Sequence, residues 1–157
     1  MSDTPVFLSE RLKAEGEKQY TIFKNLTETQ WQMEVYTEGT TWTIRNVLAH
    51  FVTSERGFLK LFTNILEGGK GAAEDFSIDR YNARQQEKTQ DLTPDTLIEQ
   101  FKSVRAQMVA WVNGLTEEDL RVEGRHPFLG LVPLTDMIKM VYRHNQIHLR
   151  DIRRVLN

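Results

Sequence analysis

The stretch that decides the fold is residues 134–156, LTDMIKMVYRHNQIHLRDIRRVL. Its apolar side chains recur every three or four residues, which is the period of an α-helix with one buried face. Two histidines, His144 and His148, fall inside this apolar stripe. We therefore predict a helix that begins at Thr135 and reaches Leu156, with both histidines facing inward. The stripe consists of Leu134, Met137, Ile138, Val141, His144, His148, Ile152 and Val155.

Three other segments show the same helical period. The first predicted helix spans Pro5–Leu26. The second begins after the capping residue Thr43 and continues to Leu66, where two glycines end it. The third begins at Thr93, followed by a proline and an acid, and its stripe continues to Leu115. No segment alternates polar and apolar residues as a strand does, so the sequence predicts an all-α four-helix bundle.

The link between the second and third helices is long, running from Glu67 to Leu92, and we predict a short helix within it at Asp79–Gln86. A turn between antiparallel helices needs only about 2 to 8 residues. A longer link can return the chain along the bundle and let the two helices run parallel. We therefore predict an up-down-down-up arrangement within a single domain, residues 1–157.

Composition limits the class of protein. The chain carries 20 Lys and Arg against 22 Asp and Glu, for a net charge of −2. We take this balance to exclude nucleic acid and anionic membranes as partners. The basic residues near the C-terminus are interpreted as complementing the helix dipole. They are Arg143, Arg150, Arg153 and Arg154.

The chain contains no cysteine, which excludes disulfides, thiolate catalysis and iron–sulfur clusters. No apolar run approaches the length of a membrane span, and no signal peptide precedes the first helix. We expect a cytoplasmic protein.

The two inward histidines are four residues apart, so their rings lie one helical turn apart on one face. This spacing lets two imidazoles bind one metal ion, as in the zinc-protease motif H-E-x-x-H. Position 145 is Asn rather than Glu, so the protease motif itself is absent. The pair alone is equally compatible with hydrogen-bonded core histidines.

His50 favours the metal interpretation, because it lies on the flank of the second helix's stripe and can face a neighbouring helix. One His from one helix and two from another form the three-ligand pattern of an open metal site. We therefore predict that His50, His144 and His148 bind one divalent ion. His126 lies among turn residues and is predicted to be a solvated loop residue, with a place at the mouth of a pocket as the alternative.

Two carboxylates are candidates for supporting roles around this site. Glu55 falls in the middle of an apolar stripe, where a bare charge is expensive. It either pairs with an Arg, accepts a proton from a liganding His, or lies where the stripe opens to solvent. Asp151 follows His148 on the same side, and an ion pair with Arg150 or Arg154 is the favoured interpretation.

Four segments, taken in order, resemble the DinB-like metal-binding superfamily. Two carry the histidines, WTIRNVLAHF at 42–51 and HNQIHLRDIR at 144–153. The others are FSIDRYNA at 76–83, which is similar to the family's Asp-x-x-Asn segment, and LTEEDL at 115–120. Each motif is weak alone, but their order covers nearly the whole chain.

The resemblance implies a four-helix bundle, often a homodimer, whose three histidines bind nickel, zinc or a similar ion. Iron and manganese remain open, since imidazole also serves them. Tyr81 and Asn82 become pocket candidates only through this resemblance. The superfamily includes enzymes that transfer a low-molecular-weight thiol or use one to isomerise maleylpyruvate.

Three functions follow from these observations. The first is a metal-dependent, thiol-dependent S-transferase acting on a small-molecule substrate. The second is a metal-dependent hydrolase that uses metal-bound water. The third is a bundle that binds a metal or small ligand without turnover.

Overall fold

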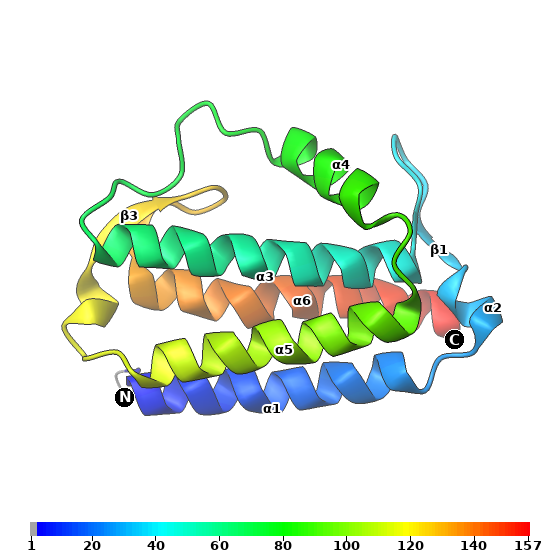
Figure 1. The fold of residues 1–157 in the computed structure, drawn as a ribbon, viewed down its shortest axis with the longest axis horizontal. Coiled ribbons are helices and arrows are strands. Elements are labelled where there is room, and N and C mark those ends of the chain that lie inside the picture. The colour runs from blue at the N-terminus through cyan, green and yellow to red at the C-terminus, as the bar shows by residue number, and fades with distance from the viewer. Residues whose placement is uncertain (1–2) are drawn as a thin grey trace.

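The computed structural model describes residues 3–157, and four long helices dominate it (Figure 1). Helices α1 and α6 run in one direction along the bundle, whereas α3 and α5 run in the other. The predicted all-α, up-down-down-up bundle is therefore confirmed. The long helices are α1 (Pro5–Lys24), α3 (Ile44–Leu66), α5 (Pro94–Asn113) and α6 (Leu134–Leu156).

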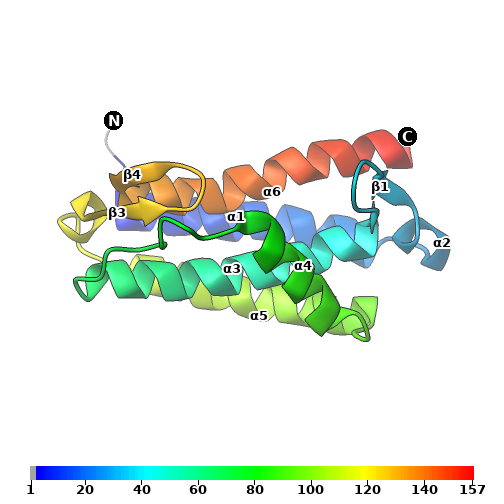
Figure 2. The same cartoon turned by 90° about the horizontal axis from the view of Figure 1, so that it is seen from above.

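Short elements lie at the two ends of the bundle and over the face that is seen in Figure 2. Two are hairpins that the sequence did not predict, because strands of two to four residues are too short for an alternating pattern to be recognised. The hairpins pair β1 (Glu34–Tyr36) with β2 (Trp42–Thr43) and β3 (Glu123–His126) with β4 (Gly130–Pro133). The remaining elements are α2 (Glu28–Trp31), α4 (Ile78–Thr89) and the 3₁₀ turn η1 (Asp119–Arg121).

Capping residues set the helix starts as predicted in two cases. The hydroxyl of Thr43 accepts a hydrogen bond from the backbone N–H of Asn46 at 3.3 Å, and the Asn46 amide bonds back to Thr43. Thr93 caps α5 in the same way. Helix α6 instead begins at Leu134, after Pro133, with no side-chain cap. The predicted start at Thr135 was therefore one residue late.

The core has three parts along the bundle axis. An apolar cluster fills each end, one around Phe62 and Met137 and the other around Phe51 and Phe101. Buried polar residues of all four long helices lie between these clusters, and they form what we call the polar layer. The polar layer consists of Glu15, Gln19, His50, Thr53, Glu55, Arg105, His144 and Asn145.

The crossover returns over α3, and α4 lies against that helix (Figures 1 and 2). Arg45 of α3 donates to the backbone carbonyl of Leu92 at the crossover's end. At the other end, Gly71 adopts φ +92° and contacts the backbone of Arg125 so closely that a Cβ would meet its carbonyl oxygen. The crossover is thereby fixed to both α3 and β3. Among the described residues, no helix is long and apolar enough to span a bilayer.

Candidate metal centre

The side chains of His50, His144 and His148 converge inside the bundle. The Nε2 atoms of His50 and His144 are 2.9 Å apart, and those of His144 and His148 are 3.2 Å apart. One ring nitrogen from each histidine lies within 4.8 Å of the others. His50 comes from α3 and the other two come from successive turns of α6. Ring nitrogens at such separations can share one ion, whose bonds to imidazole are about 2.0–2.1 Å for zinc.

A hydrogen-bonded chain fixes which nitrogen of His148 faces this point. The Tyr36 hydroxyl on β1 lies 2.5 Å from a carboxylate oxygen of Asp151 and 2.8 Å from Nδ1 of His148. A carboxylate only accepts, so the single tyrosine proton goes to Asp151 and the Nδ1–H of His148 donates to the hydroxyl. Nε2 of His148 therefore presents a lone pair. Outer partners of this kind orient metal-binding histidines.

Protons alone do not satisfy the three nitrogens. Nε2 of His148 carries a lone pair and no proton. A proton on Nε2 of His144 can point directly at either His148 or His50, but not at both. If His50 supplies the proton instead, the lone pairs of His144 and His148 face each other at 3.2 Å. A cation would satisfy all three lone pairs at once, so the donor set fits a divalent ion better than it fits a hydrogen-bonded core.

Burial keeps the imidazoles neutral, which is the form that binds metals. Burial, followed by the charges of His144 and His148, lowers the pKa of His50 well below its ordinary value. Burial, together with a charge on His148, lowers the pKa of His144 to about 4. For His148, burial lowers the pKa while the Asp151 carboxylate opposes the shift. Protons therefore compete weakly with a cation here near neutral pH.

A mostly apolar cavity of about 290 Å³ reaches His50 from the side of α4. His50 and Ser54 line it, and the Ser54 hydroxyl lies 3.1 Å from Nδ1 of His50. Tyr81 and Asn82, the two residues suggested by family resemblance, also line the cavity. The Tyr81 hydroxyl donates to the backbone carbonyl of Thr53 at 3.0 Å. The wall is completed by Gly57, Phe58, Lys60, Leu61, Asn64, Gly71, Ala72, Phe76, Ile78, Pro127 and Phe128.

His126 lies at the end of β3 and is only 1% exposed, so the prediction of a solvated loop residue was wrong. The turn residues around it predicted a loop, but residues 123–126 form strand β3 and the ring packs onto α3. The imidazole stacks on Phe58 with ring centroids 5.3 Å apart. Its Nδ1 accepts hydrogen bonds from the backbone N–H groups of Phe128 and Leu129.

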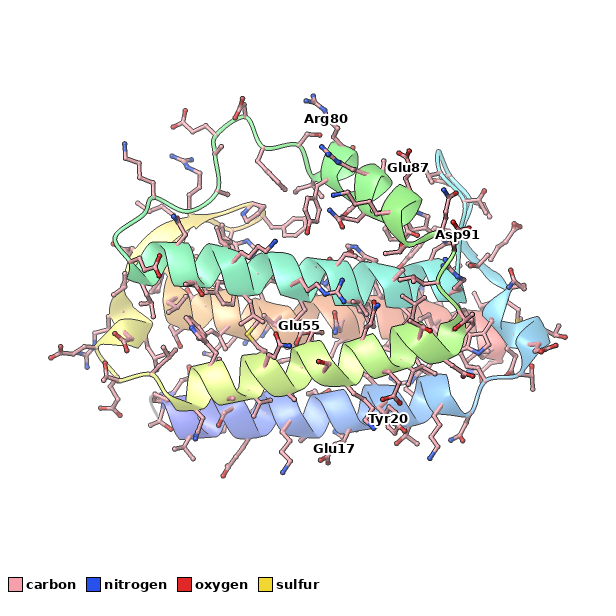
Figure 3. All side chains as sticks on the ribbon, viewed as in Figure 1. Glu17, Tyr20, Glu55, Arg80, Glu87 and Asp91 are labelled. Carbon is pink, nitrogen blue, oxygen red and sulfur yellow. The ribbon has the colours of Figure 1, made fainter. Side chains whose placement is uncertain are left out.

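Glu55 lies in the interior between α3 and α5 (Figure 3) and is 2% exposed, so the alternative of a stripe opening to solvent does not hold. Both its carboxylate oxygens accept hydrogen bonds from the Arg105 guanidinium at 2.8 Å. Arg105 also donates to the carbonyl of Leu12. Glu55 is thus engaged by an arginine rather than by a histidine.

Asp151 contacts the expected arginines only loosely, at 3.6 Å from Arg150 and 3.7 Å from Arg154. Its short bond is the one to Tyr36, a residue that the sequence analysis did not single out. Only the unpredicted β1–β2 hairpin brings Tyr36 to α6, so the helical pattern held no signal for it. For Ser54 the sequence did hold a signal, because a residue four positions after His50 lies one helical turn away on the same face.

Comparison with known proteins identifies the family. The DinB superfamily matches this sequence over residues 11–152. No curated protein matches the chain significantly in sequence.

Several solved structures share the fold, among them the following three. The colibactin self-resistance protein ClbS, in complex with double-stranded DNA, has a TM-score of 0.78 and 13% identity over 100% of this chain and 98% of its own. YfiT from Bacillus subtilis is described as a probable metal-dependent hydrolase with an unusual four-helix bundle topology. Its TM-score is 0.72 and its identity 17%, over 96% of this chain and 83% of its own. A mycothiol-dependent maleylpyruvate isomerase has a TM-score of 0.73 and 16% identity, over 94% of this chain and 59% of its own.

The exclusion of nucleic-acid partners was wrong as an inference from net charge, because a protein of this fold was crystallised with double-stranded DNA. Net charge is a sum over the whole chain, whereas phosphate contacts depend on where the basic residues lie. Here Arg143, Arg150, Arg153 and Arg154 are all exposed on α6 despite the overall charge of −2.

Proposed function

The chain belongs to the DinB superfamily, and on that basis we propose that it is a metal-dependent enzyme whose single divalent ion is bound by His50, His144 and His148. The observation that carries the proposal is the convergence of three ring nitrogens within 4.8 Å. Nickel and zinc are the proposed ions, because both suit imidazole ligands.

The surrounding residues would do three things for such a site. Tyr36 and Asp151 hold His148 with its Nε2 lone pair toward the shared point, and Ser54 lies against Nδ1 of His50. Burial of the three imidazoles keeps them neutral. The apolar cavity beside His50 accommodates a small substrate. A divalent ion bound there supplies a Lewis acid that lowers the pKa of a water molecule or a thiol.

We propose transfer of a low-molecular-weight thiol to a small electrophile as the reaction. The chain contains no cysteine, so the sulfur nucleophile comes from a second substrate. The second candidate reaction is hydrolysis, which the description of YfiT as a metal-dependent hydrolase favours. Membership of the family also supports a homodimer as the proposed assembly.

Metal content tests the ligand set. Protein dialysed against nickel or zinc and analysed by elemental mass spectrometry should contain about one ion per chain. His144→Ala should lose the ion, whereas Arg143→Ala, which changes an exposed neighbour on the same helix, should retain it. Circular dichroism checks that both variants are folded. Full occupancy in folded His144→Ala would disprove the ligand assignment.

Activity tests the reaction. Glutathione, bacillithiol or mycothiol is added with 1-chloro-2,4-dinitrobenzene, and product formation is compared before and after metal removal by a chelator. Metal-dependent release of the thioether supports the transferase. Hydrolysis of ester substrates without added thiol would favour the hydrolase instead, and a metal-bound protein inactive in both assays would favour a non-catalytic bundle.

Nucleic-acid binding is a separate candidate function, favoured by an exposed basic stripe on α6. Arg143, Arg150 and Arg154 recur at helical spacing and share one face of that helix. Fluorescence anisotropy with a short DNA duplex tests this candidate at two salt concentrations. Replacing all three with Ala should weaken binding and reduce its salt dependence. Unchanged affinity in the triple variant would exclude this face.

A further inference from the structure

The buried ring of His126 has a defined tautomer. Its Nδ1 accepts hydrogen bonds from the backbone N–H of Phe128 at 3.1 Å and of Leu129 at 3.3 Å. A nitrogen that accepts from N–H groups carries no proton, so the proton of the neutral ring lies on Nε2. Burial lowers the pKa of His126 to about 4, so the ring is neutral at physiological pH.

The Nε2–H group has no hydrogen-bond partner among residues 3–157, although it is buried. An unpaired buried donor is costly and rare in folded proteins. Ligand-binding sites are one place where such donors are kept, because the ligand satisfies them. The unpaired donor is therefore an observation that points to a ligand.

The position of the ring says where that ligand lies. Nδ1 faces the backbone of the β3–β4 turn, so the Nε2–H group points away from these two N–H donors. Two aromatic residues that line the cavity enclose the ring, Phe58 at 5.3 Å and Phe128 at 5.8 Å between centroids. Both also pack against His144, at 6.4 and 6.2 Å. His126 thus does not itself line the cavity, but it packs on two residues of the cavity wall that also contact His144.

Building on the proposed function, we propose that His126 orients the substrate by donating a hydrogen bond from Nε2–H to a carbonyl or carboxylate oxygen. The predicted substrate class is a small, mostly apolar molecule with one such oxygen group. The apolar lining of Phe58, Phe76 and Phe128 accommodates its body, and His126 recognises the oxygen.

Two variants separate this role from a structural one. His126→Asn keeps an oxygen near the position of Nδ1 to accept from the turn backbone, but it lacks the Nε2–H donor. His126→Gln places an amide donor near the position of Nε2 and should recover part of the function. His126 is not one of the three proposed metal ligands, so both variants should retain the metal content of the wild type.

Benzoate is the probe, and toluene is its control because it has the same ring without oxygens. Binding is measured by calorimetry or NMR in metal-free and zinc-loaded protein. We expect His126→Asn to weaken benzoate binding about 10- to 100-fold, the effect of losing a hydrogen bond to a charged group, and to leave toluene binding unchanged. A long-range ¹H–¹⁵N spectrum of the wild type should show the Nε2–H tautomer, whose proton resonance shifts when benzoate binds.

Equal benzoate affinity in the wild type and His126→Asn would overturn the proposal, as would an Nδ1–H tautomer or a wild type that binds no benzoate. The tautomer measurement needs no variant, so it decides the question even if His126→Asn does not fold. If the wild type binds no zinc, the proposed metal centre fails, while the comparison in metal-free protein still tests His126.

Discussion

Two polar clusters lie in the middle of the bundle, the Glu55–Arg105 pair and the three histidines, of which His148 is only partly buried. Glu55 and Arg105 carry opposite charges, and each oxygen of the carboxylate meets an N–H of the guanidinium at 2.8 Å. The three histidines present like atoms to one another at 2.9 and 3.2 Å. The first cluster is complete within the chain, whereas a cation would complete the second. Burial of polar groups alone therefore does not mark a functional site, but burial without complementary partners does.

The carboxylate–guanidinium cluster should show the largest effect when one half is removed. Glu55→Gln leaves the Arg105 charge buried and half-paired, and we expect a loss of about 3–5 kcal/mol in the free energy of unfolding. Urea denaturation measures it. The double variant Glu55→Leu, Arg105→Met should recover much of the loss, because it removes both charges. A double variant less stable than the single one would mean that this pair contributes net stability to the fold.

The histidine cluster should make the metal-free protein sensitive to acid. The pKa values of His126 and His144 are about 4 in the folded chain, below the ordinary value of 6.5, so the unfolded chain binds more protons between these limits. Stability is therefore fully present above pH 6.5 and is lost as the pH falls toward 4. Each such histidine should contribute up to about 1.4 kcal/mol per pH unit.

Thermal or urea denaturation of metal-free protein at pH 6.5, 5.5 and 4.5 measures this slope. His126→Asn should make it shallower, because one titrating group is absent. Stability that rises on acidification would contradict the assignment of buried neutral histidines.

The contact between the β1–β2 hairpin and α6 should show the smallest effect, confined to the histidine cluster. Tyr36→Phe removes the hydroxyl that accepts from His148 and donates to Asp151. We expect metal affinity to fall about 10- to 100-fold with little change in the stability of metal-free protein. Competition with a chromophoric chelator measures it. The matched control is Tyr20→Phe, which changes a half-buried tyrosine of α1 beside Lys102 of α5 (Figure 3). Equal affinities in the two variants would show that His148 needs no outer partner.

The helical period was sufficient to predict the four long helices, their order and the inward direction of His144 and His148. The length of the crossover was sufficient to predict the parallel pair α3 and α5. Tyr36 and the buried position of His126 were beyond this reasoning, because both depend on short hairpins whose pairing is set by tertiary contacts. The exclusion of nucleic-acid partners failed because it used the net charge of the chain and ignored how the basic residues are distributed on α6.

The distance in sequence between the two halves of the histidine cluster has a consequence for how the protein matures. His50 and His144 are 94 residues apart, and α6 is synthesised after the other three long helices. A nascent chain can present His50 early, but the three histidines converge only after α6 has docked. Acquisition of the proposed ion would therefore be coupled to the docking of α6, and a chain that stops before α6 should emerge without an ion.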